Sequence, residues 1–236
     1  MVTYLAYTAG ELQGSTQDRN LAYMACHFSL YTTGLSNLPE VLPSSSMLIL
    51  NDQIPISGHD SHRIADQLQE TIESFSCDSL LLDFQRPGNE ETAQLCHLLA
   101  AQMPCPLGIS HHYASSIDCA VFLPPPPLDM PLSEHMKPWQ GRKIWLECAL
   151  EAAEFTITPD GCRVSPLPYV FAQEETFIEE SLHCRYRCEV DPSKIRFHLY
   201  RTADQLDALM EEADHLGIEK SIGLYQQLGK RKPLVE

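Results

Sequence analysis

The sequence is short of basic residues and of long hydrophobic runs. It contains 16 lysines and arginines against 32 aspartates and glutamates, which gives a formal net charge of −16 at pH 7. Nucleic acids and anionic membrane surfaces are bound through clustered lysine and arginine, so this balance argues against both as partners. No apolar run approaches the ~18 residues needed to cross a membrane. We therefore expect a protein with neither a nucleic-acid nor a membrane partner.

A signal peptide, a cofactor motif and a metal motif are also missing. Met1 leads almost directly into a strand-like segment. Nothing resembles a phosphate loop, a nucleotide fingerprint or a Ser–His–Asp triad. The nine cysteines are odd in number and mostly lie in apolar segments, which indicates reduced thiols, and Cys184 and Cys188 have no second pair to complete a metal site. These features predict a cytoplasmic protein without cofactor or metal.

What the sequence does contain is an alternation of strand-like and helix-like segments. Helices are predicted to begin after Asp60 or Ser61, after Asn89 and after Thr202, each of which can cap a helix. Alternating strands and helices imply parallel strands joined by right-handed crossovers. We therefore predict a compact, irregular (β/α)8 TIM barrel rather than an open doubly wound sheet. The predicted strands are 2–9, 27–32, 47–51, 79–84, 106–110, 119–123, 144–157 and 221–228.

The later part of the chain departs from this alternation. Four prolines at 124–127 cannot pair in a sheet, and 128–142 is predicted to be a loop. A turn of sequence TPDG predicts a hairpin between 144–157 and 162–165, a helix is expected around 173–181, and 185–190 pairs with 194–200. We therefore predict one barrel domain over 1–229, with a hairpin insertion at about 156–200 and a charged tail at 230–236.

The most informative strand runs from Ser79 to Phe84 and ends in polar residues. Side chains alternate along a strand, so Asp83 and Gln85 point to one side and Phe84 to the other. In a barrel of parallel strands, active sites are built at the carboxyl ends of the strands. This strand therefore predicts a site that includes Asp83 and Gln85.

Six segments follow one another in an order that is typical of a known enzyme family. They are 21–32 and 47–51 (second and third strands), 78–85 (DSLLLDFQ, signature D-G-x-D-x-D-x-E), 117–123 (the M-x-Y-D strand), 144–155 and 222–229 (IGLYQQLG). This order resembles glycoside hydrolase family 18, in particular its spore-cortex and peptidoglycan-lytic N-acetylglucosaminidases. The resemblance covers nearly the whole chain and implies the barrel fold and an amino-sugar glycan or cell-wall fragment as ligand. In that family a glutamic acid protonates the leaving oxygen, and the acetamido group of the substrate attacks the anomeric carbon.

Residue by residue, the chain departs from the catalytic pattern. Asp78 and Asp83 match the first and last aspartates of the signature, but Leu81 stands for the middle aspartate and Gln85 for the acid glutamate. The M-x-Y-D positions fall on 123–126, which read LPPP. A glutamine amide has no proton to donate near neutral pH. The resemblance therefore implies a catalytically degenerate member.

Other carboxylates could form a different catalytic pair. Glu147 and Glu151 share a face of the predicted strand 144–157, and either could oppose Asp83 across the mouth, as in other glycosidases. His111 and His112 would point apart on a strand, which argues against one shared metal. The candidate catalytic residues are Asp83, Glu151 and Glu147, and the candidate substrate-binding residues are Tyr7, Asn51, Asp83, Gln85, His111, Glu151 and Tyr225.

Two functional hypotheses follow. The first is a barrel that has lost chitinase-type hydrolysis and binds an amino-sugar glycan or cell-wall fragment, or serves as a scaffold. The second is an active hydrolase that uses Asp83 with Glu151 or Glu147. Measurable glycan hydrolysis that is lost when these carboxylates are mutated would support the second hypothesis, and its absence would support the first.

Overall fold

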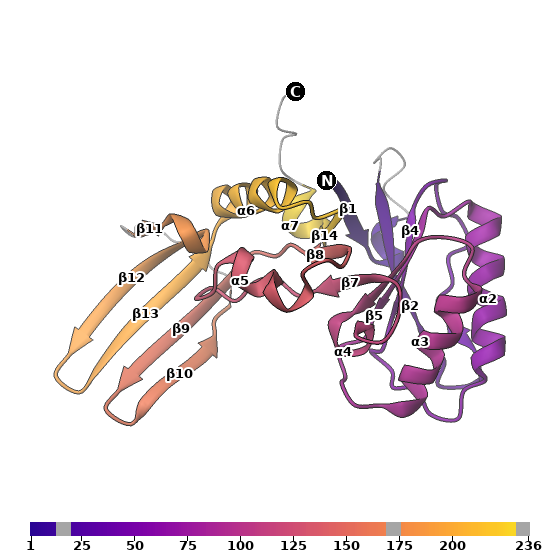
Figure 1. Ribbon diagram of the computed structural model, residues 1–236, viewed down its shortest axis with the longest axis horizontal. Coiled ribbons are helices and arrows are strands. Elements are labelled where there is room, and N and C mark those ends of the chain that lie inside the picture. The colour runs from indigo at the N-terminus through magenta and orange to yellow at the C-terminus, as the bar shows by residue number, and fades with distance from the viewer. Residues whose placement is uncertain (13–19, 169–175, 230–236) are drawn as a thin grey trace. The chain divides into compact units, whose positions relative to one another are not determined.

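The computed structural model describes residues 1–12, 20–168 and 176–229, which form two compact units (Figure 1). The barrel unit comprises Val2–Leu123, Gly141–Glu147 and the chain from Glu219 onward, and the second unit comprises Met1, Pro124–Gln140 and Cys148–Ile218. The predicted hairpin insertion at about 156–200 falls within the second unit. The predicted tail at 230–236 lies outside the described residues.

The barrel unit is a closed ring of eight parallel strands, which confirms the predicted (β/α)8 class. Each strand pairs with the next around the ring, and β1 pairs with both β14 and β2 to close it. A short strand, β3 (Leu35–Ser36), adds an antiparallel partner to the end of β2. The ring order is β1 (Val2–Tyr7), β14 (Lys220–Leu224), β8 (Ile144–Glu147), β7 (Ala120–Leu123), β6 (Leu107–Ser110), β5 (Ser79–Asp83), β4 (Met47–Asn51) and β2 (Leu21–Phe28).

Two long helices, α2 (Ser61–Phe75) and α3 (Glu90–Gln102), lie side by side outside the strands (Figure 1). Both begin where the sequence predicts. The Asp60 carboxylate accepts hydrogen bonds from the first free backbone N–H groups of α2, and the Asn89 side chain does the same for α3. The other helices of this unit are single turns: α1 (Ala9–Leu12), α4 (His111–Ala114) and α7 (Tyr225–Leu228).

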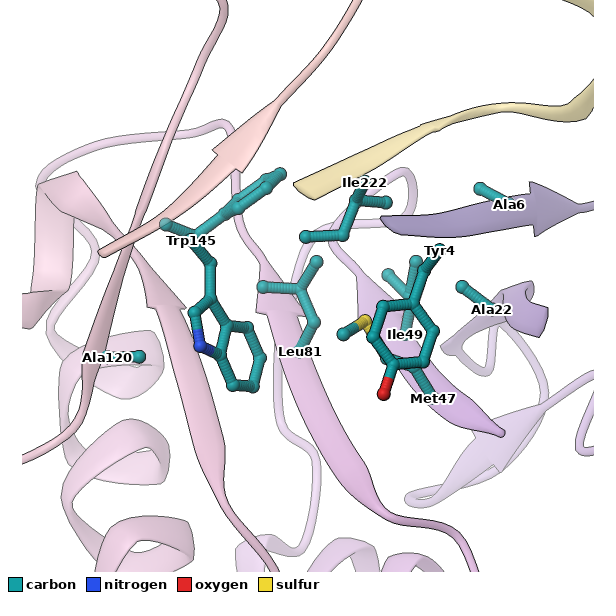
Figure 2. Packing of buried hydrophobic residues seen from close by; sticks show 10 residues of the cluster. Tyr4, Ala6, Ala22, Met47, Ile49, Leu81, Ala120, Trp145 and Ile222 are labelled. Atoms are coloured by element: carbon teal, nitrogen blue, oxygen red, sulfur yellow. The ribbon is translucent and has the colours of Figure 1, made fainter. Parts of the chain in front are cut away.

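Side chains fill the barrel interior. The Trp145 indole is almost completely buried, at 1% exposure, and packs with apolar side chains from the other strands (Figure 2). Gly108 on β6 makes room for it, because a Cβ atom there would lie 2.2 Å from the indole ring. The cluster also contains Tyr4, Ala6, Ala22, Met47, Ile49, Leu81, Ala120, Phe122 and Ile222.

The second unit is built on a five-stranded antiparallel sheet. Its two hairpins, β9 with β10 and β12 with β13, are the antiparallel pairs that the sequence predicts. The strand order is β10 (Gly161–Pro166), β9 (Glu151–Thr158), β13 (Lys194–Arg201), β12 (Cys184–Asp191) and β11 (Phe177–Glu179). The helices are α5 (Leu132–Met136) and α6 (Ala203–His215), with single 3₁₀ turns η1 (Lys137–Trp139) and η2 (Glu180–Leu182).

A buried arginine ties the proline run to this sheet. Arg201 at the end of β13 is 0% exposed, and its guanidinium donates to the Glu151 carboxylate at 2.5 Å. It also donates to the backbone carbonyl of Pro126 at 2.9 Å. A polyproline segment has no N–H groups to donate, but its carbonyls still accept, and Arg201 uses one of them to hold the segment against the sheet.

Three predicted strand bounds are wrong in the barrel unit. The expected strand 144–157 is two strands, because β8 ends at Glu147 and β9 begins at Glu151 in the other sheet. Apolar alternation continues across the break, so the pattern alone could not reveal it. The last strand ends at Leu224, where α7 begins, and the second strand is β2 (Leu21–Phe28) rather than 27–32. The register of β2 with β4 shifts between Tyr23 and Cys26, and such an irregularity interrupts the alternation by which a strand is recognised.

Two further predictions are wrong in the second unit. The expected loop 128–142 contains α5 and η1. The expected helix at about 173–181 is partly outside the described residues, and its described part forms β11 and the start of η2. Edge pairing with β12 gives Phe177–Glu179 an extended backbone that the local sequence does not indicate.

Candidate functional site

A cavity of about 670 Å³ opens at the carboxyl ends of the barrel strands. Parallel strands all end on this side, so the residues that end different strands meet there. The polar lining residues are Thr8 after β1, His27 on β2, Asn37 after β3, Asn51, Asp52 and Gln53 at the end of β4, Asp83, Gln85 and Arg86 at the end of β5, and Glu147 at the end of β8.

The floor of the cavity is apolar. Leu81 lies on β5 two residues before Asp83 and belongs to the buried cluster in the barrel interior. It occupies the position that the family resemblance assigns to the middle aspartate. The other apolar lining residues with buried side chains are Ala6, Ile49, Phe122 and Ile222. The middle carboxylate of the signature is therefore absent from the cavity floor, whereas Asp83 keeps the position of the last one.

Asp83 and Gln85 point to the same side of β5, as predicted, and bond to each other. The Gln85 side-chain amide donates a hydrogen bond to the Asp83 carboxylate. Burial raises the pKa of Asp83 above its ordinary value, the Gln85 hydrogen bond opposes this shift, and the nearby charge of Asp52 adds to it. Gln85 stands where the resemblance places the general acid, but it donates an amide N–H hydrogen bond to Asp83 instead of carrying an acidic proton.

Asp52 fixes the backbone that carries Gln85. Its buried carboxylate accepts hydrogen bonds from the backbone N–H groups of Gln85 at 3.0 Å and of Arg86 at 2.9 Å. The Arg86 guanidinium donates in return to the carbonyl of Gln53 at 3.1 Å. The turns that follow β4 and β5 are thus held together, which keeps Gln85 in place beside Asp83.

Asn51 and His27 are also tied to neighbouring strands. The Asn51 amide donates to the carbonyl of Met24 at 2.8 Å, and its oxygen accepts from the backbone N–H of Gln53 at 3.0 Å. The His27 ring contacts the side chain of Asn37 at 3.1 Å and the carbonyl of Phe28 at 2.7 Å. These bonds preorganise this side of the cavity.

The two additional carboxylates belong to different units. Glu147 ends β8 and lines the barrel cavity with Asp83. Glu151 begins β9 in the second unit, where it pairs with the buried Arg201. Burial raises the pKa of Glu151, and the charge of Arg201 opposes that shift. The prediction that Glu147 and Glu151 share a face of one strand is therefore wrong.

Four predicted sugar-binding residues do not line the cavity: Tyr7, His111, Tyr225 and Glu151. Tyr7 is completely buried and stacks on Tyr225 with ring centroids 4.4 Å apart. His111 begins α4 rather than lying on a strand, and its ring lies 3.9 Å from that of His112, so these rings do not point apart. Asn51, Asp83 and Gln85 do line it. The assignment of these residues to sugar binding stays a prediction.

Sequence reasoning missed His27, Asn37 and Arg86 as lining residues. His27 lies near the end of β2 (Leu21–Phe28), whereas the predicted strand 27–32 begins at this residue and so places it far from the carboxyl end. Asn37 has a left-handed backbone (φ 56°) after β3, a conformation that asparagine tolerates better than most residues. A correct strand boundary at Phe28 would have placed His27 at the mouth.

The described residues contain no group of three or more histidine, cysteine, aspartate or glutamate side chains arranged to hold a metal ion. Within the same residues, no helix is long and apolar enough to cross a membrane. Five of the nine cysteines are buried, as expected for small core residues: Cys26, Cys77, Cys96, Cys148 and Cys184.

Comparison with known proteins finds no matching family model and no matching curated sequence. Solved structures do match, at low identity. One is the spore cortex-lytic enzyme SleL of Bacillus megaterium (10% identity, TM-score 0.60, 94% of this chain and 70% of that one). Another is a family 18 chitinase of Cycas revoluta in complex with (GlcNAc)3 (8%, 0.62, 97% and 96%). A third is a chitinase-like agglutinin of Robinia pseudoacacia (11%, 0.58, 93% and 93%).

These structures share the closed parallel barrel and extend over nearly all of this chain. At such low identities the likeness concerns the fold, and it agrees with the segment order that first suggested the family. The chain has the fold of the family 18 glycoside hydrolases.

Proposed function

We propose that the mouth of the barrel binds an amino-sugar glycan or cell-wall fragment and does not cleave it by the family 18 mechanism. The observation that carries this proposal is the hydrogen bond from the Gln85 amide to Asp83 inside the cavity. A site with this geometry can hold a sugar through hydrogen bonds, but Gln85 has no proton for the leaving oxygen.

The loss of the acid is accompanied by the loss of its partners. Leu81 stands at the position of the middle aspartate, and prolines occupy the positions of the tyrosine and aspartate that follow β7, so the tyrosine that would orient the acetamido group together with Asp83 is missing. Loss of a general acid alone typically lowers the rate by ~10²–10⁴-fold. With the orienting tyrosine absent as well, we expect no measurable hydrolysis by this route.

The structural neighbours support a glycan as the ligand class. One is a chitinase with (GlcNAc)3 bound, another is a cortex-lytic enzyme, and a third is a chitinase-like agglutinin. The cavity of about 670 Å³ is within the usual range for small-molecule sites, and its apolar floor and polar rim suit a sugar ring. A role as a scaffold that binds no glycan is the outcome if every glycan fails to bind.

A second candidate function is hydrolysis by relocated carboxylates. It is favoured by one observation: Asp83 and Glu147 line the same cavity, and burial raises the pKa of Asp83 toward that of an acid catalyst. Glu151 is the weaker candidate because its carboxylate pairs with Arg201. This hypothesis expects turnover that Glu147→Gln abolishes and that Glu151→Gln retains.

We also propose a cytoplasmic location, for which the cysteine usage of the sequence is the support. A cell-wall ligand would then be a fragment recycled into the cell. Fractionation of cells that express the tagged protein tests this, and recovery of the protein outside the cytoplasm would contradict it.

Isothermal titration with N-acetylglucosamine oligomers and muropeptides, followed by product analysis, separates the two functions. The first predicts a saturable heat and unchanged ligand. Sustained heat with product formation, lost in Asp83→Ala, would overturn it in favour of the second. Absence of heat for every glycan would contradict both.

A further inference from the structure

The hairpin that follows β2 displays an exposed apolar pair, Leu30 and Tyr31, beyond the carboxyl end of β2. β2 and β3 are antiparallel, with His27 opposite Ser36 and Phe28 opposite Leu35, so residues 29–34 form the hairpin tip. β2 runs toward the carboxyl end of the barrel, and the tip therefore projects beyond the mouth. Its first three residues can extend at most about 10 Å past Phe28.

The two arms of this hairpin contribute to the cavity itself. His27 precedes the tip and Asn37 follows it, and both line the cavity and contact each other. The tip is thus continuous in the chain with two lining residues. A glycan that fills the cavity and leaves it on this side would meet the tip first.

The backbone of the tip is held in place. The Ser29 N–H donates to the Gly34 carbonyl at 3.0 Å, and the Ser29 hydroxyl accepts from the N–H groups of Tyr31 and Thr32 at 3.2 and 3.1 Å. The base is anchored to the helix α2 side, where Leu35 N–H donates to the Gln67 side chain at 2.9 Å. A rigid support loses little conformational entropy when a ligand binds.

The side chains at the tip are nevertheless turned to solvent. Tyr31 is 92% exposed and Leu30 is 69% exposed, although both are large and apolar. Thr32 and Thr33 beside them are also exposed. The tip therefore combines one aromatic ring, one aliphatic side chain and two threonines, a mixture that suits a ligand with apolar faces and many hydroxyls.

We propose that Tyr31, supported by Leu30, is a second sugar-contacting position outside the cavity, and that it selects longer oligosaccharides. This inference rests on the proposed glycan binding of the barrel. An aromatic ring offers a flat apolar surface together with a polar hydroxyl, at a low cost in side-chain entropy. The pair is too small for a stable protein interface by itself, which requires roughly 800 Å² from each partner.

The test is isothermal titration of the full chain with (GlcNAc)3 and (GlcNAc)6. We expect the parent to bind the hexamer more tightly than the trimer. Tyr31→Ala should weaken hexamer binding roughly tenfold, as for a well-placed aromatic contact, and leave the trimer constant unchanged. Tyr31→Phe should retain the hexamer affinity because it keeps the ring. Val41→Ala, which shortens a 74% exposed side chain between β3 and β4, is the matched control and should change neither constant.

Three results would overturn the inference. Equal hexamer binding by the parent and Tyr31→Ala would mean that the tip is not a sugar contact, while the proposed function would stand. Equal weakening of trimer and hexamer would place Tyr31 in the first site. Failure of the parent to bind either oligomer would overturn the proposed function as well. Thermal unfolding of each variant should match the parent because Tyr31 makes few contacts.

Discussion

The two ends of the barrel are built from the same strands but use their polar side chains differently. At the amino end, the Lys220 ammonium at the start of β14 lies 4.9 Å from the ring centroids of Tyr4 on β1 and Trp145 on β8. It also donates to the carboxylate of Asp78, just before β5, at 3.4 Å, and Tyr4 donates to the same carboxylate. The Lys220 side chain is 15% exposed, so this cluster closes the amino end.

At the carboxyl end the same four strands surround an open cavity. β1 ends beside Thr8, β5 in Asp83, β8 in Glu147 and β14 in Leu224, and all four residues line it. Lys220, Tyr4 and Asp78 at the amino end bond to one another and close that end, whereas the hydrogen-bonded polar groups at the carboxyl end line a cavity that a ligand can fill. We therefore expect substitutions at the amino end to change mainly stability and substitutions at the carboxyl end to change mainly ligand binding, as is usual for this fold. Four substitutions test this division, from the largest expected effect to the smallest.

Trp145→Ala should lower the free energy of unfolding by about 3–5 kcal/mol, because it removes a fully buried aromatic side chain and leaves a cavity. Trp145→Phe is the matched variant and should cost clearly less. It keeps a ring and also removes the indole N–H, which is buried without a hydrogen-bond partner within the described residues. Chemical denaturation measures both, and equal losses would contradict this packing role.

Asp78→Asn should cost about 1–3 kcal/mol, because it leaves the mostly buried Lys220 ammonium without its counter-charge. The control is Asp66→Asn on α2, which removes an exposed carboxylate and the same formal charge. Urea unfolding at neutral pH compares them. If the two variants lost the same stability, the amino-end cluster would be no more than surface charge.

Asp83→Asn should raise the free energy of unfolding at neutral pH, by less than the two preceding substitutions lower it. Burial raises the pKa of Asp83 above its ordinary value of 3.8, so the folded state favours the protonated carboxyl. The protonated carboxyl therefore makes its full contribution to stability at pH values below that ordinary pKa, and this contribution is lost as the pH rises through the raised pKa. The variant lacks this loss, so its stability relative to the parent should rise with pH above about 4. Unfolding measured at several pH values tests this, and a flat difference would contradict it.

Gln85→Glu should have the smallest effect, with no detectable turnover of N-acetylglucosamine oligomers. It restores an acid, but Leu81 and the prolines after β7 remain. A second carboxylate beside Asp83 should raise the pKa of Asp83 further by charge repulsion. Product analysis after long incubation is the measurement. Turnover in this variant alone would show that the acid was the one missing element and would break the proposed explanation for lost chemistry.

The sequence predicted those features that depend on local chemistry. Helix caps at Asp60 and Asn89 and the strand that ends in Asp83 and Gln85 follow from residue types at fixed spacing. The break between Glu147 and Glu151 could not be predicted, because no proline or glycine marks it and only pairing with two different sheets separates the strands. Arg86 was missed for a similar reason, since a hydrogen bond to the distant Asp52 holds its backbone at the cavity, whereas His27 was missed because the end of β2 was placed too late.

The closure of the ring has a consequence for the time course of folding. Thr3 on β1 and Ser221 on β14 are hydrogen-bonded neighbours although 218 residues separate them. At a synthesis rate of about 5–20 residues per second, the first strand waits roughly 10–40 s on the ribosome for its partner. The second unit is made in that interval and has largely local hairpins, which form quickly. During this wait β1 has one unpaired edge, so the nascent chain is most exposed to misassembly just before its last strand is made.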